Sequence, residues 1–143
     1  MPGRSFKSIF YHLVFHTKNN EPYLEDFTLR KQIYHYIKNK CKKHEIILFE
    51  IGGIENHIHM LLYIPPKISI SDAVKLIKGS SSYFVNQELI GEDTIYWQEG
   101  YGIFTISRER VSFIRKYIQN QEEHHKMGSI IEEFEKIEKY EKN

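Results

Sequence analysis

Two histidines separated by a single residue, His57 and His59, are the first feature of this 143-residue sequence that could carry chemistry. Side chains two residues apart on a β-strand point to the same face, so both imidazoles would project together. A neutral imidazole is a common ligand of divalent metal ions. The pair therefore predicts half of a metal site. The alternative is a pair of half-buried histidines that hydrogen-bond to their neighbours.

A tyrosine and a glutamine near the end of the chain could complete such a site. Tyr117 and Gln121 are four residues apart, which places them on one face of a helix. Gln121 could supply a neutral oxygen ligand, and Tyr117 would stand beside the metal as a nucleophile. A phenol has a pKa of about 10 and is mostly protonated at neutral pH. A divalent cation would help by polarising the oxygens of a phosphate. The alternative is a tyrosine whose ring simply packs on the sheet.

Four further histidines lie where they could approach this site. His12 and His16 would share one face of a strand, either near the site or paired with each other. His124 and His125 follow Gln121 by three and four residues, so either could reach the metal from the same helical face. Solvated or phosphate-contacting roles are the favoured alternatives for these two.

The hydrophobic pattern and the turn residues predict the elements that must position these side chains. Alternating and helical spacings, interrupted by Asn, Pro and Gly clusters, define the boundaries. They predict strands over 6–16, 46–51, 57–64 and 97–106, and helices over 24–44, 71–89 and 108–125, with a charged amphipathic helix after Gly128. The pair Gly52-Gly53 is expected to close the second strand.

This order of elements predicts an α+β fold. Strand-helix-strand occurs twice, which matches the ferredoxin-like split βαβ arrangement, an antiparallel sheet with helices on one face. The C-terminal helices are additional to that unit. We expect one domain over residues 1–126, followed by a charged helical tail over residues 127–143.

Composition bounds the class of protein. The single cysteine, Cys41, cannot form an internal disulfide, and no apolar run approaches the roughly 20 residues needed to cross a membrane. We expect a cytoplasmic protein. The net charge of +1 conceals an uneven distribution: residues 1–121 carry 16 basic and 12 acidic side chains, and residues 122–143 carry 4 and 7. The modestly basic body leaves DNA binding open despite the near-neutral total.

These motifs together resemble a known family. The segment His57-Ile58-His59 is similar to the His-hydrophobic-His motif of HUH endonucleases, and residues 117–121 resemble the tyrosine helix of the single-tyrosine (Y1) IS200/IS605-type transposases. Residues 69–72, 78–82 and 96–102 resemble that family as well. The match runs in the right order from about residue 6 to about residue 126, so residues 1–126 would be the Y1 transposase catalytic domain.

The resemblance implies a specific function. Such proteins are ferredoxin-like homodimers that cut and rejoin single-stranded DNA at transposon ends and recognise nearby DNA hairpins. Carried over, Tyr117 would form a covalent 5′-phosphotyrosine, while His57, His59 and Gln121 would bind Mg²⁺ or Mn²⁺. Tyr117 could act in trans, in the partner subunit's site. Asn56 departs from the family, whose members more often carry an acidic residue there, which puts metal affinity in doubt.

Basic and hydroxyl side chains near these motifs are candidates for DNA contact. Phosphate contacts position nucleic acid without reading its sequence. The candidates are Lys75, Lys78, Ser80, Arg108 and Arg115, each with a solvated surface as the alternative. Aromatic side chains, among them Tyr83, Trp97 and Tyr101, could stack on unpaired bases, although a core position is favoured for Trp97.

Two other functions fit the same sequence. One is a domesticated relative that nicks repetitive palindromes with the same chemistry in a host role. The other is a ferredoxin-like nucleic-acid-binding module without cleavage activity. Such a module would have no need of Tyr117, Gln121 and both histidines, which argues against it.

Overall fold

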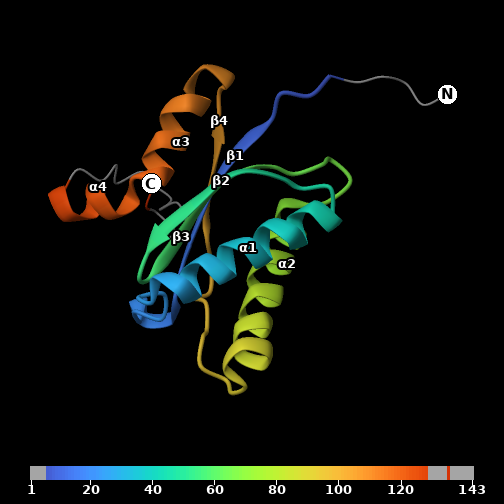
Figure 1. The fold of residues 1–143 in the computed structure, drawn as a ribbon. Helices are drawn as coiled ribbons and strands as arrows, with labels where there is room; N and C mark the ends of the chain where they lie inside the picture. The colour runs from blue at the N-terminus through green and yellow to red at the C-terminus, as the bar shows by residue number, and fades with distance from the viewer. Residues whose placement is uncertain (1–5, 129–134, 136–143) are drawn as a thin grey trace, which may run out of the picture.

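The computed structural model describes residues 6–128 and residue 135. Four strands form one antiparallel sheet in the order β2-β3-β1-β4 (Figure 1). Their bounds are β1 Phe10–His16, β2 Ile47–Ile54, β3 His57–Tyr63 and β4 Gly102–Ile106. Helix α1 (Phe27–Lys43) connects β1 to β2, and helix α2 (Ile70–Tyr83) lies between β3 and β4. This is the split βαβ arrangement, so the predicted α+β ferredoxin-like class is confirmed.

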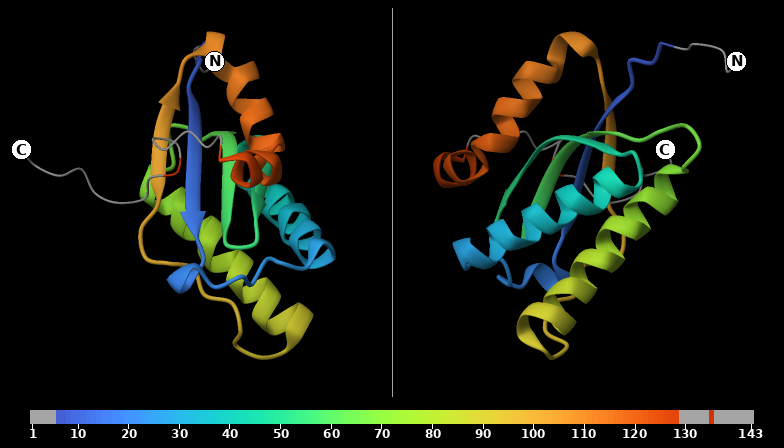
Figure 2. Two further views of the ribbon diagram at one scale, coloured as in Figure 1. Left: turned by 90° about the vertical axis from the view of Figure 1, so that its left-hand side faces the viewer. Right: turned by 45° about the vertical axis from the view of Figure 1, so that its right-hand side comes forward.

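Helices cover both faces of the sheet, whereas the sequence predicted helices on one face. Figure 2 shows α1 and α2 on one side of the strands and α3 (Val111–Gln119) on the other. Helix α4 (Gln121–Met127) follows α3 and contacts β2. The C-terminal helices are therefore a second layer rather than an extension of the first. None of the helices in the described part of the chain is long and apolar enough to span a membrane.

The alternation of side chains along β1 and β3 creates two different faces. Leu13, Phe15, Ile58 and Met60 pack into the larger hydrophobic core beneath α1 and α2. The intervening residues face α3, where a smaller core contains Leu61, Ile106, Ile114, Tyr117 and Ile118. Because the period of a strand is two, burying the first set directs the histidines of the same strands to the α3 face.

Local capping explains where the two long helices begin. The Asp26 side chain accepts hydrogen bonds from the backbone N–H groups of Thr28 and Leu29 at the start of α1. At the start of α2, the Ser69 hydroxyl accepts from the N–H of Asp72. The helix thus begins before the predicted start at residue 71. Beyond α2, residues 84–90 continue as a π-helix to Gly91.

Two glycines predicted to end a strand lie inside it. Gly52 and Gly53 belong to β2, which extends to Ile54. A Cβ atom on Gly52 would lie 2.3 Å from the backbone oxygen of Ile118 in α3. The absence of a side chain therefore lets α3 approach the edge strand closely.

The predicted helix over residues 108–125 is divided. A short 3₁₀ turn at 108–110 leads into α3, and Asn120, at φ −106° and ψ 28°, separates α3 from α4. Ser107 stands at the start of the turn, but its side chain makes no capping hydrogen bond. Most of the predicted tail, residues 127–143, lies outside the described residues, which include only Met127, Gly128 and Glu135 of it.

Candidate active site

The two histidines of β3 lie side by side on the face covered by α3. Their ring centroids are 5.0 Å apart, and their exposed fractions are 2% for His57 and 0% for His59. The neighbours on β1 are also histidines, because His12 and His16 share that face. The His16 ring stacks on His57 with centroids 4.8 Å apart. The two histidines of each pair share one face of their strand, as the sequence predicted, and the structure places both pairs on the same face of the sheet.

Hydrogen bonds at the Nδ1 atoms orient both rings. Asn56 Oδ1 lies 2.9 Å from His57 Nδ1, and His12 Nε2 lies 2.8 Å from His59 Nδ1. An amide oxygen can only accept a hydrogen bond, so His57 Nδ1 carries the hydrogen. In the neutral ring, Nε2 of His57 then presents a lone pair. Asn56 performs this orienting role without an acidic side chain.

Burial keeps the inner imidazoles neutral. Desolvation, with a smaller effect of neighbouring His59, lowers the pKa of His12 to about 3. Desolvation also dominates at His59 and lowers its pKa to about 4, although Glu135 opposes the shift. Neutral imidazole is the form that binds metal ions. His59 is therefore available as a ligand near neutral pH without first losing a proton, and His12 contacts it as a neutral ring.

Gln121 presents its carbonyl oxygen to the same place. Its Nε2 atom donates to the backbone oxygen of Tyr117 at 3.2 Å, which leaves Oε1 3.3 Å from His57 Nε2. Gln121 is almost fully buried, with an exposed fraction of 1%. Although Asn120 divides the helix, the one-turn relation between residues 117 and 121 persists. The structure thus brings together the His pair and the predicted oxygen donor.

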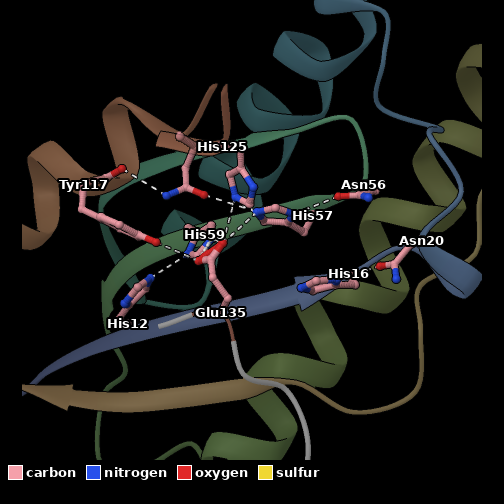
Figure 3. A network of polar contacts seen from close by, with 10 residues as sticks. His12, His16, Asn20, Asn56, His57, His59, Tyr117, His125 and Glu135 are labelled. Atoms are coloured by element: carbon pink, nitrogen blue, oxygen red, sulfur yellow. Dashed lines mark hydrogen bonds and ion pairs between the residues drawn. The ribbon is translucent and has the colours of Figure 1, made fainter. Parts of the chain in front are cut away.

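A carboxylate that the sequence did not single out lies at the centre of the cluster (Figure 3). Glu135 Oε1 is 3.2 Å from His57 Nε2, and Oε2 is 2.9 Å from His59 Nε2. His125 Nε2 lies 3.0 Å from Oε1. Burial opposes ionisation of this group, but the contacts with His57 and His59 outweigh that effect and hold the pKa of Glu135 well below its usual range. Glu135 is therefore an anion in the folded chain.

No pattern of residue spacing in the sequence could have identified Glu135 as a residue of the site. It is one of several glutamates in an acidic stretch, and it lies 18 residues beyond Tyr117 and 76 beyond His59. Its contacts join residues that lie far apart in the sequence. The sequence also makes His125 a candidate ligand, and in the structure its Nε2 contacts Glu135 Oε1.

Tyr117 lies against the histidines from the α3 side. Its hydroxyl donates to Glu135 Oε2 at 3.1 Å, and its ring centroid is 5.9 Å from that of His59. The exposed fraction is 2%, and His124 stacks on the ring at 4.8 Å. The ring packs within the smaller core while the hydroxyl reaches the polar cluster. A single chain thus brings Tyr117 beside its own His pair.

The donor set fits a divalent metal ion. His57, His59 and Glu135 each offer one ligand atom, and these atoms lie within 4.8 Å of one another. Neighbouring ligands of an octahedral ion with bonds of about 2.1 Å are separated by about 3 Å. The contacts of 3.2 and 2.9 Å between the imidazole nitrogens and Glu135 have this spacing. Imidazole and carboxylate together suit manganese, zinc or magnesium, so the set does not choose one metal.

The candidate DNA contacts are divided between the two sides of the sheet. Lys75, Lys78 and Ser80 lie on α2, on the face opposite Tyr117. Lys78 Nζ donates to the backbone oxygens of Gln98 and Gly100, at 2.7 and 2.9 Å. The Ser80 hydroxyl donates to Leu76 within its own helix, at 2.6 Å. These bonds connect parts of the chain, and of the three residues only Lys75 is exposed.

On the other side of the sheet, Arg108 lies in the turn before the tyrosine helix and Arg115 lies within that helix. Both are exposed. The Arg108 guanidinium lies over the Phe6 ring at 5.5 Å, and Arg115 Nε donates to Glu50 Oε2 at 3.3 Å. Trp97 packs against Phe15 with centroids 4.9 Å apart, consistent with the favoured core position.

Proteins with similar sequences are transposases. The transposase for insertion sequence element IS200 of Salmonella typhimurium is 31% identical over 126 residues, covering 82% of this chain and 80% of that protein. The ISDra2 transposase TnpA of Deinococcus radiodurans is 34% identical over 84 residues, covering 54% and 57%.

Two solved structures share the fold. A Deinococcus radiodurans protein assigned as a transposase has a TM-score of 0.59 at 24% identity, over 85% of this chain and 97% of that one. A REP-associated tyrosine transposase bound to a REP hairpin has a TM-score of 0.62 at 16% identity, over 91% and 74%. The family model described as "Transposase IS200 like" matches residues 5–121. With this match and the 31% identity to the Salmonella protein, the chain belongs to the IS200-like transposase family.

Proposed function

We propose that this transposase cuts and rejoins single-stranded DNA at transposon ends, with Tyr117 as the nucleophile. One observation carries the proposal. The buried Tyr117 hydroxyl donates to Glu135, and the same carboxylate contacts both His57 and His59. A nucleophile therefore lies one side chain away from a set of metal ligands, which is the arrangement that phosphoryl transfer to a side chain needs.

The chemistry exchanges one phosphoester bond for another. Tyr117 Oη attacks the phosphorus of a DNA backbone phosphate and loses its proton to the surroundings. The Oη–P bond forms, the P–O3′ bond breaks, and the leaving O3′ takes up a proton. The products are a 5′-phosphotyrosine and a free 3′-OH. Because the covalent bond retains the energy of the phosphodiester, attack by a 3′-OH rejoins strands without ATP.

We assign the metal to His57, His59 and Gln121, with Mg²⁺ or Mn²⁺ as the native ion. When bound, the ion would polarise the phosphate oxygens and neutralise charge at the reacting centre. The Nδ1 contacts with Asn56 and His12 hold the two imidazoles with Nε2 toward the site. Gln121 is held by its bond to the Tyr117 backbone, so the third ligand moves with the nucleophile.

For the substrate we propose single-stranded DNA that carries a hairpin. The REP-associated transposase of the same fold is bound to a REP hairpin, which supports a similar ligand here. Lys75, Lys78, Ser80, Arg108 and Arg115 remain the candidates for phosphate contact. We further propose a homodimer, in which Tyr117 can serve the partner subunit's site as well as its own.

The likeness to the REP-associated protein also supports a second candidate. In that case the chain would be a domesticated relative that nicks repetitive palindromes with the same chemistry. Hairpins that flank the reading frame of this gene would identify a transposon, whereas palindromes scattered elsewhere in the genome would identify the host role. A binding module without cleavage activity is disfavoured because it has no use for a buried tyrosine among metal ligands.

The test uses labelled single-stranded hairpin DNA with Mn²⁺. We expect a slowly migrating covalent adduct on a denaturing gel, which is absent in Tyr117→Phe. Tyr36→Phe is a matched control, because this substitution also removes only a hydroxyl. Tyr36 lies in α1, on the opposite side of the sheet from Tyr117, and stacks on Phe84 with ring centroids 4.2 Å apart. An adduct that persists in Tyr117→Phe would show that another residue is the nucleophile.

A further inference from the structure

We propose that Glu135 is a fourth protein ligand of the divalent metal and the positioning residue that holds the Tyr117 hydroxyl beside it. This inference rests on the proposed function, because it assigns a role within the same site. The family resemblance supplies no residue at this position, which lies beyond residues 5–121.

The first argument is that hydrogen-bond acceptors meet at one point. His57 Nε2 carries a lone pair in the neutral ring, because Asn56 fixes the hydrogen at Nδ1. It faces Gln121 Oε1 at 3.3 Å and Glu135 Oε1 at 3.2 Å. Three acceptors at such distances repel one another unless a proton on the imidazole or a metal ion lies among them. A metal ion satisfies all three at once.

The second argument concerns charge. Two neutral imidazoles and an amide form a ligand set without an anion, whereas Mg²⁺ and Mn²⁺ favour carboxylate oxygens. Asn56, in a position where an acidic residue is more usual, adds no charge. Glu135 provides the missing anion, and it is the only carboxylate within 4.8 Å of both imidazole nitrogens among the described residues.

The third argument is the geometry of the two carboxylate oxygens. Oε1 is 3.0 Å from His125 Nε2, which holds the group in place from the solvent side. Oε2 accepts from the Tyr117 hydroxyl at 3.1 Å. One carboxylate thus joins the nucleophile to the metal ligands. Removing it would affect metal binding and the placement of Tyr117 together.

Metal affinity, measured without DNA, tests the ligand role directly. Isothermal titration with Mn²⁺ compares the full chain with Glu135→Ala, Glu135→Gln and Glu135→Asp. We expect Mn²⁺ to bind at least about tenfold more weakly to the Ala variant, by analogy with the loss of other residues of metal sites. The Gln variant should be intermediate, since it keeps an oxygen without the charge. Glu123→Gln is the matched control, because it removes a charge from an exposed position of α4.

The positioning role is tested with the same variants in the adduct assay at saturating Mn²⁺. We expect slower adduct formation in Glu135→Ala and partial rescue in Glu135→Asp. Unchanged Mn²⁺ affinity in Glu135→Ala would overturn the ligand role. Faster adduct formation would overturn the positioning role and show that the carboxylate competes with the DNA phosphate. A different result would contradict the proposed function itself. In that case the covalent adduct would still form in Tyr117→Phe, whatever the Mn²⁺ affinity of the Glu135 variants.

Discussion

At the scale of single residues, neutral side chains decide which atoms of the site face a ligand. Asn56 holds the hydrogen of His57 on Nδ1, and the bond from Gln121 Nε2 to the Tyr117 backbone turns Oε1 inward. Both side chains are uncharged, so neither contributes to the charge of the site. Each acts by fixing the orientation of a neighbour, which is how residues around metal ligands commonly tune affinity.

The orientation of His57 is testable through Asn56. We expect Asn56→Leu to weaken Mn²⁺ binding by roughly 10- to 100-fold, because His57 Nδ1 loses its acceptor and the ring can rotate or change tautomer. Asn56→Asp keeps an acceptor at the same place and should retain or raise the affinity. Titration of the two proteins with Mn²⁺ distinguishes them. Equal affinity in the Leu and Asp variants would mean that the Asn56 contact does not orient the ring.

At the scale of secondary structure, the approach of α3 to the edge strand positions the nucleophile. Helix α3 carries Tyr117 and contacts β2 more extensively than it contacts β3. Gly52 makes this contact possible, since its missing side chain leaves room for the Ile118 carbonyl. The site histidines belong to β3, the next strand, so the depth to which α3 settles on the sheet sets the distance between the hydroxyl and the imidazoles.

Substitution of Gly52 tests this dependence. The Cβ atom of Gly52→Ala would meet backbone at 2.3 Å, so α3 must shift. We expect a loss of about 1–3 kcal/mol in the free energy of unfolding, typical of overpacking. Adduct formation should slow more than Mn²⁺ binding weakens, because the shift displaces Tyr117 and one ligand, Gln121, while His57 and His59 stay in place. Urea denaturation and the adduct assay provide the two measurements.

Gly79 provides a control of opposite sign. It lies in α2, and a Cβ atom there would have no neighbour within 4 Å. Gly79→Ala should stabilise the protein by about 0.5–1 kcal/mol, because alanine favours the helix and glycine does not. If both alanine substitutions changed stability alike, the close approach at Gly52 would not be the cause.

At the scale of the whole molecule, the two faces of the sheet differ in composition and role. The face beneath α1 and α2 holds the larger hydrophobic core, whereas the face beneath α3 combines a small core with the buried polar cluster. The cluster joins β1, β3, α3, α4 and residue 135. An ion bound there would connect segments far apart in the chain, so metal binding should stabilise the fold.

This coupling predicts a metal-dependent unfolding free energy. At a free Mn²⁺ concentration 100 times the dissociation constant, we expect stabilisation by about 2.7 kcal/mol relative to protein in EDTA. The effect should be absent in the double variant His57→Ala/His59→Ala. Denaturation with and without Mn²⁺ measures the difference. The same stabilisation in the double variant would locate the ion elsewhere.

Much of the fold follows from local sequence patterns. The alternation around His57 and the apolar helical spacing before Lys43 identify strands and helices, because each side chain's environment is set by its immediate period. Errors arose where long-range packing prevailed. Gly52 looks like a strand terminator, yet β2 continues through it in register with β3, and its missing side chain leaves the space that α3 occupies. Asn120 interrupts a helix whose residues follow a continuous periodicity.

The sequence by itself determined the chemical inventory: two imidazoles on one strand face, a tyrosine and a glutamine one turn apart, and a modestly basic body. These properties depend only on residue type and on short spacings, so they can be inferred without knowing how the rest of the chain folds. Only the tertiary structure decided that α3 covers the face bearing the histidines, and that Glu135 lies between them and Tyr117. Such contacts depend on the path of the chain between distant residues, because no local period relates residue 135 to residues 57, 59 and 117.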